Sequence, residues 1–97
     1  MSEASKILDF NKPLKYARVH FGKDELAGQK NFLILMDNIG IISISRSDIE
    51  SEIESLKKNH FEADNRIVLH GEKMINKFEY AMKNFFPEKE YFITDTP

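Results

Sequence analysis

Three histidines are the side chains best suited to metal binding or proton transfer, because an imidazole can act as a ligand or as a general base. They are His20, His60 and His70. No two of them have the HxH, HxxxH or HExxH spacing that places a pair of imidazoles on one metal ion. We therefore expect ordinary surface histidines, no metal site and no cofactor. If the protein is instead a small dimeric enzyme or ligand-binding domain, His60, Asp64 and His70 are the residues to test first.

The segment 22–30 contains glycine and lysine, the residue types of phosphate-binding loops. Such a loop requires GxxxxGK[ST] before a helix, but here Gly28 is followed by Gln29. The neighbouring acids Asp24 and Glu25 would also repel a phosphate. The serines form no GxSxG nucleophile elbow. We predict a solvated connecting loop over 22–30, no catalytic residues and no enzyme activity.

Basic and aromatic side chains provide an alternative function, nucleic-acid binding. Arg66, Lys73 and Lys77 would share one face of a long helix, and Tyr16 and Arg18 would lie on the exposed face of a strand. Against this hypothesis, the 14 Lys and Arg are outnumbered by 16 Asp and Glu, which gives a net charge of −2. Bulk charge therefore does not favour a polyanion, and nucleic acid is the less favoured partner.

Aromatic residues are unusually frequent near the end of the chain. The chain has eight Phe and three Tyr, and in each of the adjacent pairs 85–86 and 91–92 the two rings must point in different directions. One small core therefore buries one ring of each pair more easily than both. One alternative is that the last helix and strand wrap around the core and bury most of these rings. We predict an exposed, protein-binding surface of Tyr80, Phe86, Tyr91 and Phe92, because such rings are typical anchors of protein interfaces. The function expected is that of a small regulator, inhibitor or adaptor that binds another protein, as phage and mobile-element inhibitors of this size do. A second copy of the chain is another expected partner, which would give a homodimer.

Length and composition suggest one domain, 1–97, in which residues 1–12 form a short helix or a flexible arm. The chain has no cysteine, which excludes disulfides, thiolate zinc sites and a thiol nucleophile. It has no secretory signature at its start and no apolar run of about 18 residues. We therefore expect a cytoplasmic protein that does not interact with membranes.

The elements that would position these residues follow from periodicity. Residues 15–21 alternate, with Tyr16, Arg18 and His20 on the polar side, as in a half-buried strand. The apolar run 32–36, the turn signal 37–40 and the alternation after it predict a β-hairpin over 31–45.

Ser47 and Glu50 form a capping box that predicts a helix over 47–58. Residues 64–86 fit either one long helix, which we prefer, or a strand over 66–71 followed by a helix from Glu72. Pro87 ends that helix, and residues 90–94 predict a last strand. The fold expected is α+β: a small antiparallel sheet of three to four strands, with the hairpin 31–45 central and two helices packed on one face. The other face and the sheet edges would be available to a partner.

Overall fold

The structure, a computed structural model, describes residues 14–97. The short helix or flexible arm expected over residues 1–12 lies outside the described residues. The elements, in chain order, are β1 (Leu14–Phe21), the 3₁₀ turn η1 (Lys23–Glu25), α2 (Leu26–Asn38), α3 (Arg46–Asn59), β2 (Ala63–His70), α4 (Glu72–Phe85) and β3 (Tyr91–Thr94). Within these residues, three α-helices and three strands make the mixed α+β fold that the sequence predicts.

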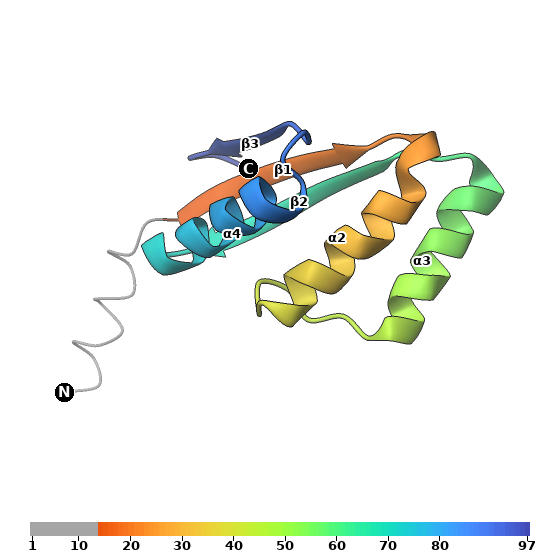
Figure 1. The fold of residues 1–97 in the computed structure, drawn as a ribbon, viewed down its shortest axis with the longest axis horizontal. Coiled ribbons are helices and arrows are strands. Elements are labelled where there is room, and N and C mark those ends of the chain that lie inside the picture. Colours follow the sequence, from red (N-terminus) through yellow and green to blue (C-terminus); the bar gives the residue numbers. More distant parts are fainter. Residues whose placement is uncertain (1–13) are drawn as a thin grey trace.

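The three strands form one antiparallel sheet in the order β2-β1-β3. β1 pairs with β2 along all eight residues of both strands, whereas β3 pairs only with Tyr16–Val19 of β1. Because both outer strands are antiparallel to β1, they are parallel to each other. α4 connects them across β1, so β2, α4 and β3 form a split β-α-β unit (Figure 1).

One face of this sheet is buried under the helices. Its buried residues in β1 and β2 are Ala17, Val19, Phe21, Ala63, Ile67 and Leu69. Side chains of α2, α3 and α4 join them in a single core cluster, so the three helices lie on the same side of the sheet (Figure 1). Among the described residues, no helix covers the other face.

Residues 31–45 do not form the expected hairpin. The apolar run 32–36 lies inside α2, and residues 39–45 connect α2 to α3. A short continuous apolar run fits a buried strand or a buried helix equally well, because its periodicity does not separate the two. The helical signal extends upstream, where buried residues recur every three or four positions. The buried residues of α2 are Leu26, Gln29, Phe32, Leu33 and Met36.

The segment 22–30 is correspondingly not a loop, because α2 begins within it. Gly28 lies inside the helix where α2 passes close to β1. A Cβ atom at position 28 would lie 3.1 Å from the Phe21 ring, so glycine permits the close approach. The predicted turn coincides with the end of α2, where Gly40 has a φ of +79°.

The helix predicted over 47–58 is confirmed as α3, but its cap is different. The hydroxyl oxygen of Ser45, not that of Ser47, accepts a hydrogen bond at the helix start, from the backbone N–H of Asp48 at 3.1 Å. Ile49 and Ile53 are buried on the stripe that faces the core. The sequence therefore located the helix and its apolar face to within two residues.

The long helix preferred for residues 64–86 is wrong, and the alternative is right. β2 ends at His70, Gly71 adopts a positive φ of 91°, and α4 begins at Glu72. The strand forms because its residues alternate between buried and exposed positions, a period of two that the helical stripe obscured. The end of α4 before Pro87, the strand over 15–21 and the last strand agree with expectation.

Candidate functional site

The uncovered face of the sheet, which we call the open face, carries the side chains that alternate with the buried ones. These are Leu14, Tyr16, Arg18, His20, Asp64, Arg66, Val68, His70, Phe92 and Thr94. Three of its apolar side chains are substantially exposed: Phe92 at 58%, Leu14 at 43% and Val68 at 42%. Their exposure shows that core packing does not require them, so they are candidates for contact with another molecule.

The register places aromatic and cationic side chains together at the centre of the open face. Arg18 lies opposite Arg66 on β2 and opposite Phe92 on β3. Tyr16, two residues earlier, lies opposite Val68. Directly opposed residues of antiparallel strands have Cβ atoms about 5 Å apart. Tyr16, Arg18, Arg66, Val68 and Phe92 therefore form one continuous surface, which we call the central patch.

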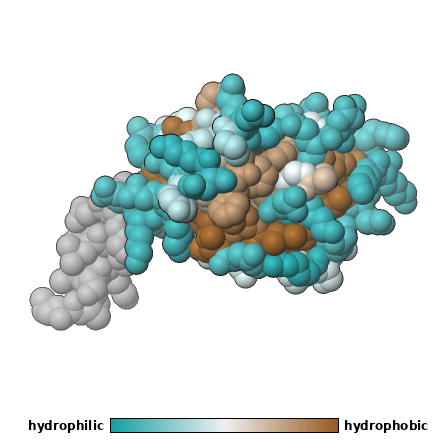
Figure 2. Space-filling model, in the orientation of Figure 1, coloured by the Kyte–Doolittle hydropathy of each residue, from teal (hydrophilic) through white to brown (hydrophobic). Residues whose placement is uncertain are grey.

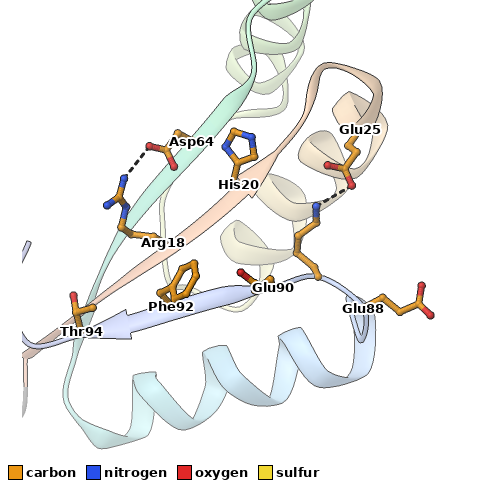
Figure 3. Close-up of a pocket in the computed structure, with 9 residues that line it drawn as sticks. Arg18, His20, Glu25, Asp64, Glu88, Glu90, Phe92 and Thr94 are labelled. Carbon is orange, nitrogen blue, oxygen red and sulfur yellow. Dashed lines mark hydrogen bonds and ion pairs between the residues drawn. The ribbon is translucent and has the colours of Figure 1, made fainter.

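A hollow of about 710 Å³, open to solvent, adjoins the central patch. Its lining residues come from all three strands, from η1 and from the loop between α4 and β3: Arg18, His20, Asp64, Phe92, Thr94, Glu25, Glu88, Lys89 and Glu90. Figure 3 shows the strand residues rising from the sheet and Glu88 directed away from the hollow. A hollow of this size can accept several side chains of a partner.

Asp64 is shared between the two arginines of the central patch. Its Oδ2 atom lies 3.3 Å from Nη2 of Arg18 and 3.9 Å from Nε of Arg66. One carboxylate thus faces two guanidinium groups, and the local charge is positive. Because all three side chains are substantially exposed, each ion pair contributes less than about 1 kcal/mol to stability. These groups can exchange partners at little cost.

The opposite end of the hollow is acidic and contains a shorter ion pair. Lys89 donates a hydrogen bond from Nζ to Oε2 of Glu25 at 2.9 Å, and the same ammonium lies 4.5 Å from the centroid of the Phe21 ring. The backbone N–H of Gly22 donates to Oε1 of Glu25 at 2.8 Å. The Gly22 N–H and then Lys89 stabilise the carboxylate and lower the pKa of Glu25 from its ordinary value of 4.5.

The structure does not bring the four predicted anchors Tyr80, Phe86, Tyr91 and Phe92 onto one surface. Phe86 is half-buried against Phe21 and another core ring, and Tyr91 is half-buried against Phe78. Tyr80 is 68% exposed and lies on the side of α4 away from its buried residues. Phe92 alone reaches the open face, because consecutive residues of a strand point to opposite faces.

Of the two basic surfaces predicted for nucleic-acid binding, one is present in the structure and the other is divided between two elements. The stripe of Arg66, Lys73 and Lys77 assumed one helix, but Arg66 lies on β2 and the lysines lie on α4. Lys77 donates a hydrogen bond to the backbone carbonyl of Ile39 at 2.9 Å. The strand face of Tyr16 and Arg18 does exist, and Arg66 joins it.

The histidines do not converge. Asp64 and His70 lie six positions apart on one strand, a distance of about 20 Å, and His60 ends α3 with a φ of 56°. His20, which lies opposite Asp64, has its Nε2 atom 3.6 Å from Oε2 of Glu62. Within residues 14–97, no three His, Cys, Asp or Glu side chains are grouped closely enough to hold a metal ion.

Sequence reasoning missed Leu14 and Val68 and did not place Arg66 beside Arg18. The usable signal was the alternation over 63–70, which assigns even-numbered residues to the exposed face once the strand is accepted. The contact of Arg66 with Arg18 depends on the order of the strands in the sheet, which cannot be inferred from local periodicity.

Comparison of the chain with protein-family models, with curated proteins and with solved structures gives no match. In the part of the chain that the structure describes, none of the helices combines the length and the apolar character needed to cross a membrane.

Proposed function

We propose that the protein acts by binding another protein through the open face of its sheet. The observation that carries this proposal is the central patch, where exposed Phe92 and Val68 lie beside Tyr16, Arg18 and Arg66. Tyr, Phe and Arg are the residue types enriched at protein interfaces. The apolar groups would be covered by apolar side chains of the partner, and the arginines would meet acidic groups at its rim.

Binding without catalysis fits the shape and chemistry of this face. The hollow beside the central patch is open to solvent, whereas a small-molecule site typically buries most of its ligand. A regulator, inhibitor or adaptor is the class of protein that we propose. The absence of cysteine is compatible with a reducing compartment, and the cytoplasm is our proposed location.

The decisive experiment compares two exposed aromatic residues on opposite sides of the molecule. Tagged wild-type protein, Phe92→Glu and Tyr80→Glu are each used to capture partners from a lysate of the source organism treated with nuclease. We expect Phe92→Glu to reduce recovery of the principal partner about tenfold or more, because it puts a charge at an interface anchor. Tyr80→Glu is the matched control and should recover the partner as the wild type does.

Far-UV circular dichroism must show that both variants are folded before recovery is compared. The opposite result, loss of the partner in Tyr80→Glu and retention in Phe92→Glu, would place the interface on α4 and contradict the proposal. Equal recovery by all three proteins would show that neither side chain anchors the partner.

A second candidate function, binding of single-stranded nucleic acid, is favoured by one specific observation. Two arginines and two aromatic rings share the central patch, and bases stack on such rings while arginines contact phosphates. Asp64 and the acidic end of the hollow oppose it. A partner that nuclease removes, together with affinity that falls steeply with salt concentration, would favour nucleic acid over protein.

A further inference from the structure

The outer edge of β2 exposes backbone hydrogen-bonding groups that can be assigned residue by residue. In an antiparallel strand, the N–H and C=O of one residue point to the same side, and the side alternates along the strand. The Val19 carbonyl accepts a hydrogen bond from the Asn65 side chain at 3.1 Å, so it faces β2. The Tyr16 carbonyl accepts from Oγ1 of Thr94 at 3.4 Å, so it faces β3. The two observations agree on one alternation.

Because Val19 pairs with Asn65, the backbone of Asn65 faces β1, and that of Asp64, Arg66 and Val68 faces outward. The next outward residue, His70, donates its N–H to the sulfur of Met74 at 3.2 Å, which is consistent with this assignment. β2 is an edge strand, and no element of residues 14–97 pairs with its outer side. Three consecutive outward positions are thus free to bond another strand.

The charged side chains on this edge are placed so that two antiparallel copies of β2 can bring opposite charges together. Asp64 and Arg66 flank Asn65, so a two-fold axis beside Asn65 places Asp64 of each copy opposite Arg66 of the other. Moving the axis by one residue places Asp64 opposite Asp64 or Arg66 opposite Arg66, which is unfavourable. Among the described residues, the only ion pair of Arg66 is the long 3.9 Å contact with Asp64, and the Arg66 side chain is 73% exposed. Its guanidinium is therefore available to a second copy.

We propose that two copies of this chain pair antiparallel through β2, with the two-fold axis beside Asn65. The outward N–H and C=O groups of Asp64 in one copy bond those of Arg66 in the other, and the reverse pair forms by symmetry. The result is one six-stranded sheet in which β2 is no longer an edge. With the axis perpendicular to the sheet, both open faces lie on the same side. The dimer does not require the protein partner proposed above, but it shares Arg66 with the central patch and would present the two central patches on one side of the sheet.

Reversing the charges of Asp64 and Arg66 tests whether β2 forms the interface and whether these two residues lie opposite each other in the dimer. Asp64→Arg and Arg66→Asp each place like charges opposite each other twice in the dimer. We expect either change to weaken self-association about tenfold or more, as measured by analytical ultracentrifugation up to millimolar protein. The double variant restores opposite charges at both positions and should associate within about threefold of the wild type. Glu54→Arg on α3 is the matched control, because it changes the net charge by the same amount as Asp64→Arg and should have no effect.

Amide hydrogen exchange provides a readout within the same strand. The amides of Asn65 and Ile67 face β1 and should be protected at every concentration, whereas the Arg66 amide should become protected only as the dimer forms. A protein that stays monomeric at millimolar concentration would overturn the proposal. A dimer in which the double variant fails to recover, or in which Arg66 exchanges freely, would place the interface elsewhere and overturn it equally.

Discussion

The two faces of the three-stranded sheet differ in what holds their side chains. On the covered face, apolar residues pack against the helices, and the polar pair of Gln29 and Asn65 is mutually hydrogen-bonded. On the open face, charged, aromatic and aliphatic side chains alternate in solvent, and their ion pairs are long and exposed. Neighbouring residues of one strand therefore have different roles: one set maintains the fold, and the other is available for recognition.

The helical side of the molecule also exposes apolar surface, but of a different kind. Figure 2 shows apolar side chains gathered over α2 and beside α4. Those of α2 and the following segment are half-buried and pack against the core: Ile34, Leu35, Ile39, Ile41, Ile42 and Ile44. The apolar residues of the open face, in contrast, are outside the core cluster. This difference is why we assign the binding role to the open face.

The largest expected effect is the difference in stability between alanine variants of two phenylalanines, one on each side of the sheet. Phe32 is fully buried between Phe21 and Phe86, whereas Phe92 is 58% exposed. Phe32→Ala should lower the free energy of unfolding by about 3–5 kcal/mol, because it leaves a cavity in the core. Phe92→Ala should lower it by less than about 1 kcal/mol. Urea denaturation measures both unfolding free energies, provided that their dependence on urea concentration is the same in the two variants. A comparable loss of stability in Phe32→Ala and Phe92→Ala would show that Phe92 belongs to the core.

A smaller effect separates the adjacent polar residues Asn65 and Asp64. Asn65 exchanges hydrogen bonds of 2.9 and 2.7 Å with Gln29, which is only 1% exposed. Asn65→Ala should cost about 1–3 kcal/mol, because it leaves the amide of Gln29 buried without a partner. Asp64→Ala removes only exposed ion pairs and should cost less than about 1 kcal/mol. Urea denaturation of dilute protein checks both values, and equal losses would contradict the distinction between the two faces.

The strands were predictable where one face is buried and the other solvated. β1 and β3 show that alternation, and the sequence located both. Residues 32–36 were assigned to a strand because they are apolar at every position. The helical spacing appears only when the buried positions Leu26 and Gln29 upstream are included, and Phe32 and Gln29 of this helix then contact β1 and β2. In residues 64–70 the helical stripe and the strand alternation coexist, so the choice depends on the pairing with β1.

The candidate site was only partly predictable for the same reason. The placement of Tyr16, Arg18 and His20 on one face of the sheet follows from alternation within β1 alone. Their contact with Arg66 and Phe92 requires the order β2-β1-β3, which brings together residues far apart in the sequence. Aromatic crowding identified Phe92, but it could not separate that residue from Tyr91, whose ring packs on Phe78.

The smallest effect that we expect concerns the ion pair at the border of the two faces. Because contacts in the folded protein lower the pKa of Glu25 from 4.5, its carboxylate contributes stability above that pH. The contribution is lost as the pH falls through the lower folded-state pKa. Glu25→Gln has no carboxylate to protonate, so its unfolding free energy should decline less steeply with acid than that of the wild type.

Urea denaturation between about pH 5 and pH 3 measures this slope. Lys89→Gln provides the matched variant: it keeps the carboxylate and the Gly22 hydrogen bond at 2.8 Å but removes the ammonium. Because the Gly22 N–H is the larger cause of the lowered pKa, Lys89→Gln should give a slope between those of the wild type and Glu25→Gln. If the unfolding free energy of Glu25→Gln fell with pH as steeply as that of the wild type, the Glu25–Lys89 ion pair would not stabilise the contact between η1 and the loop before β3. The acidic end of the hollow would then be as loosely held as the arginines of the central patch.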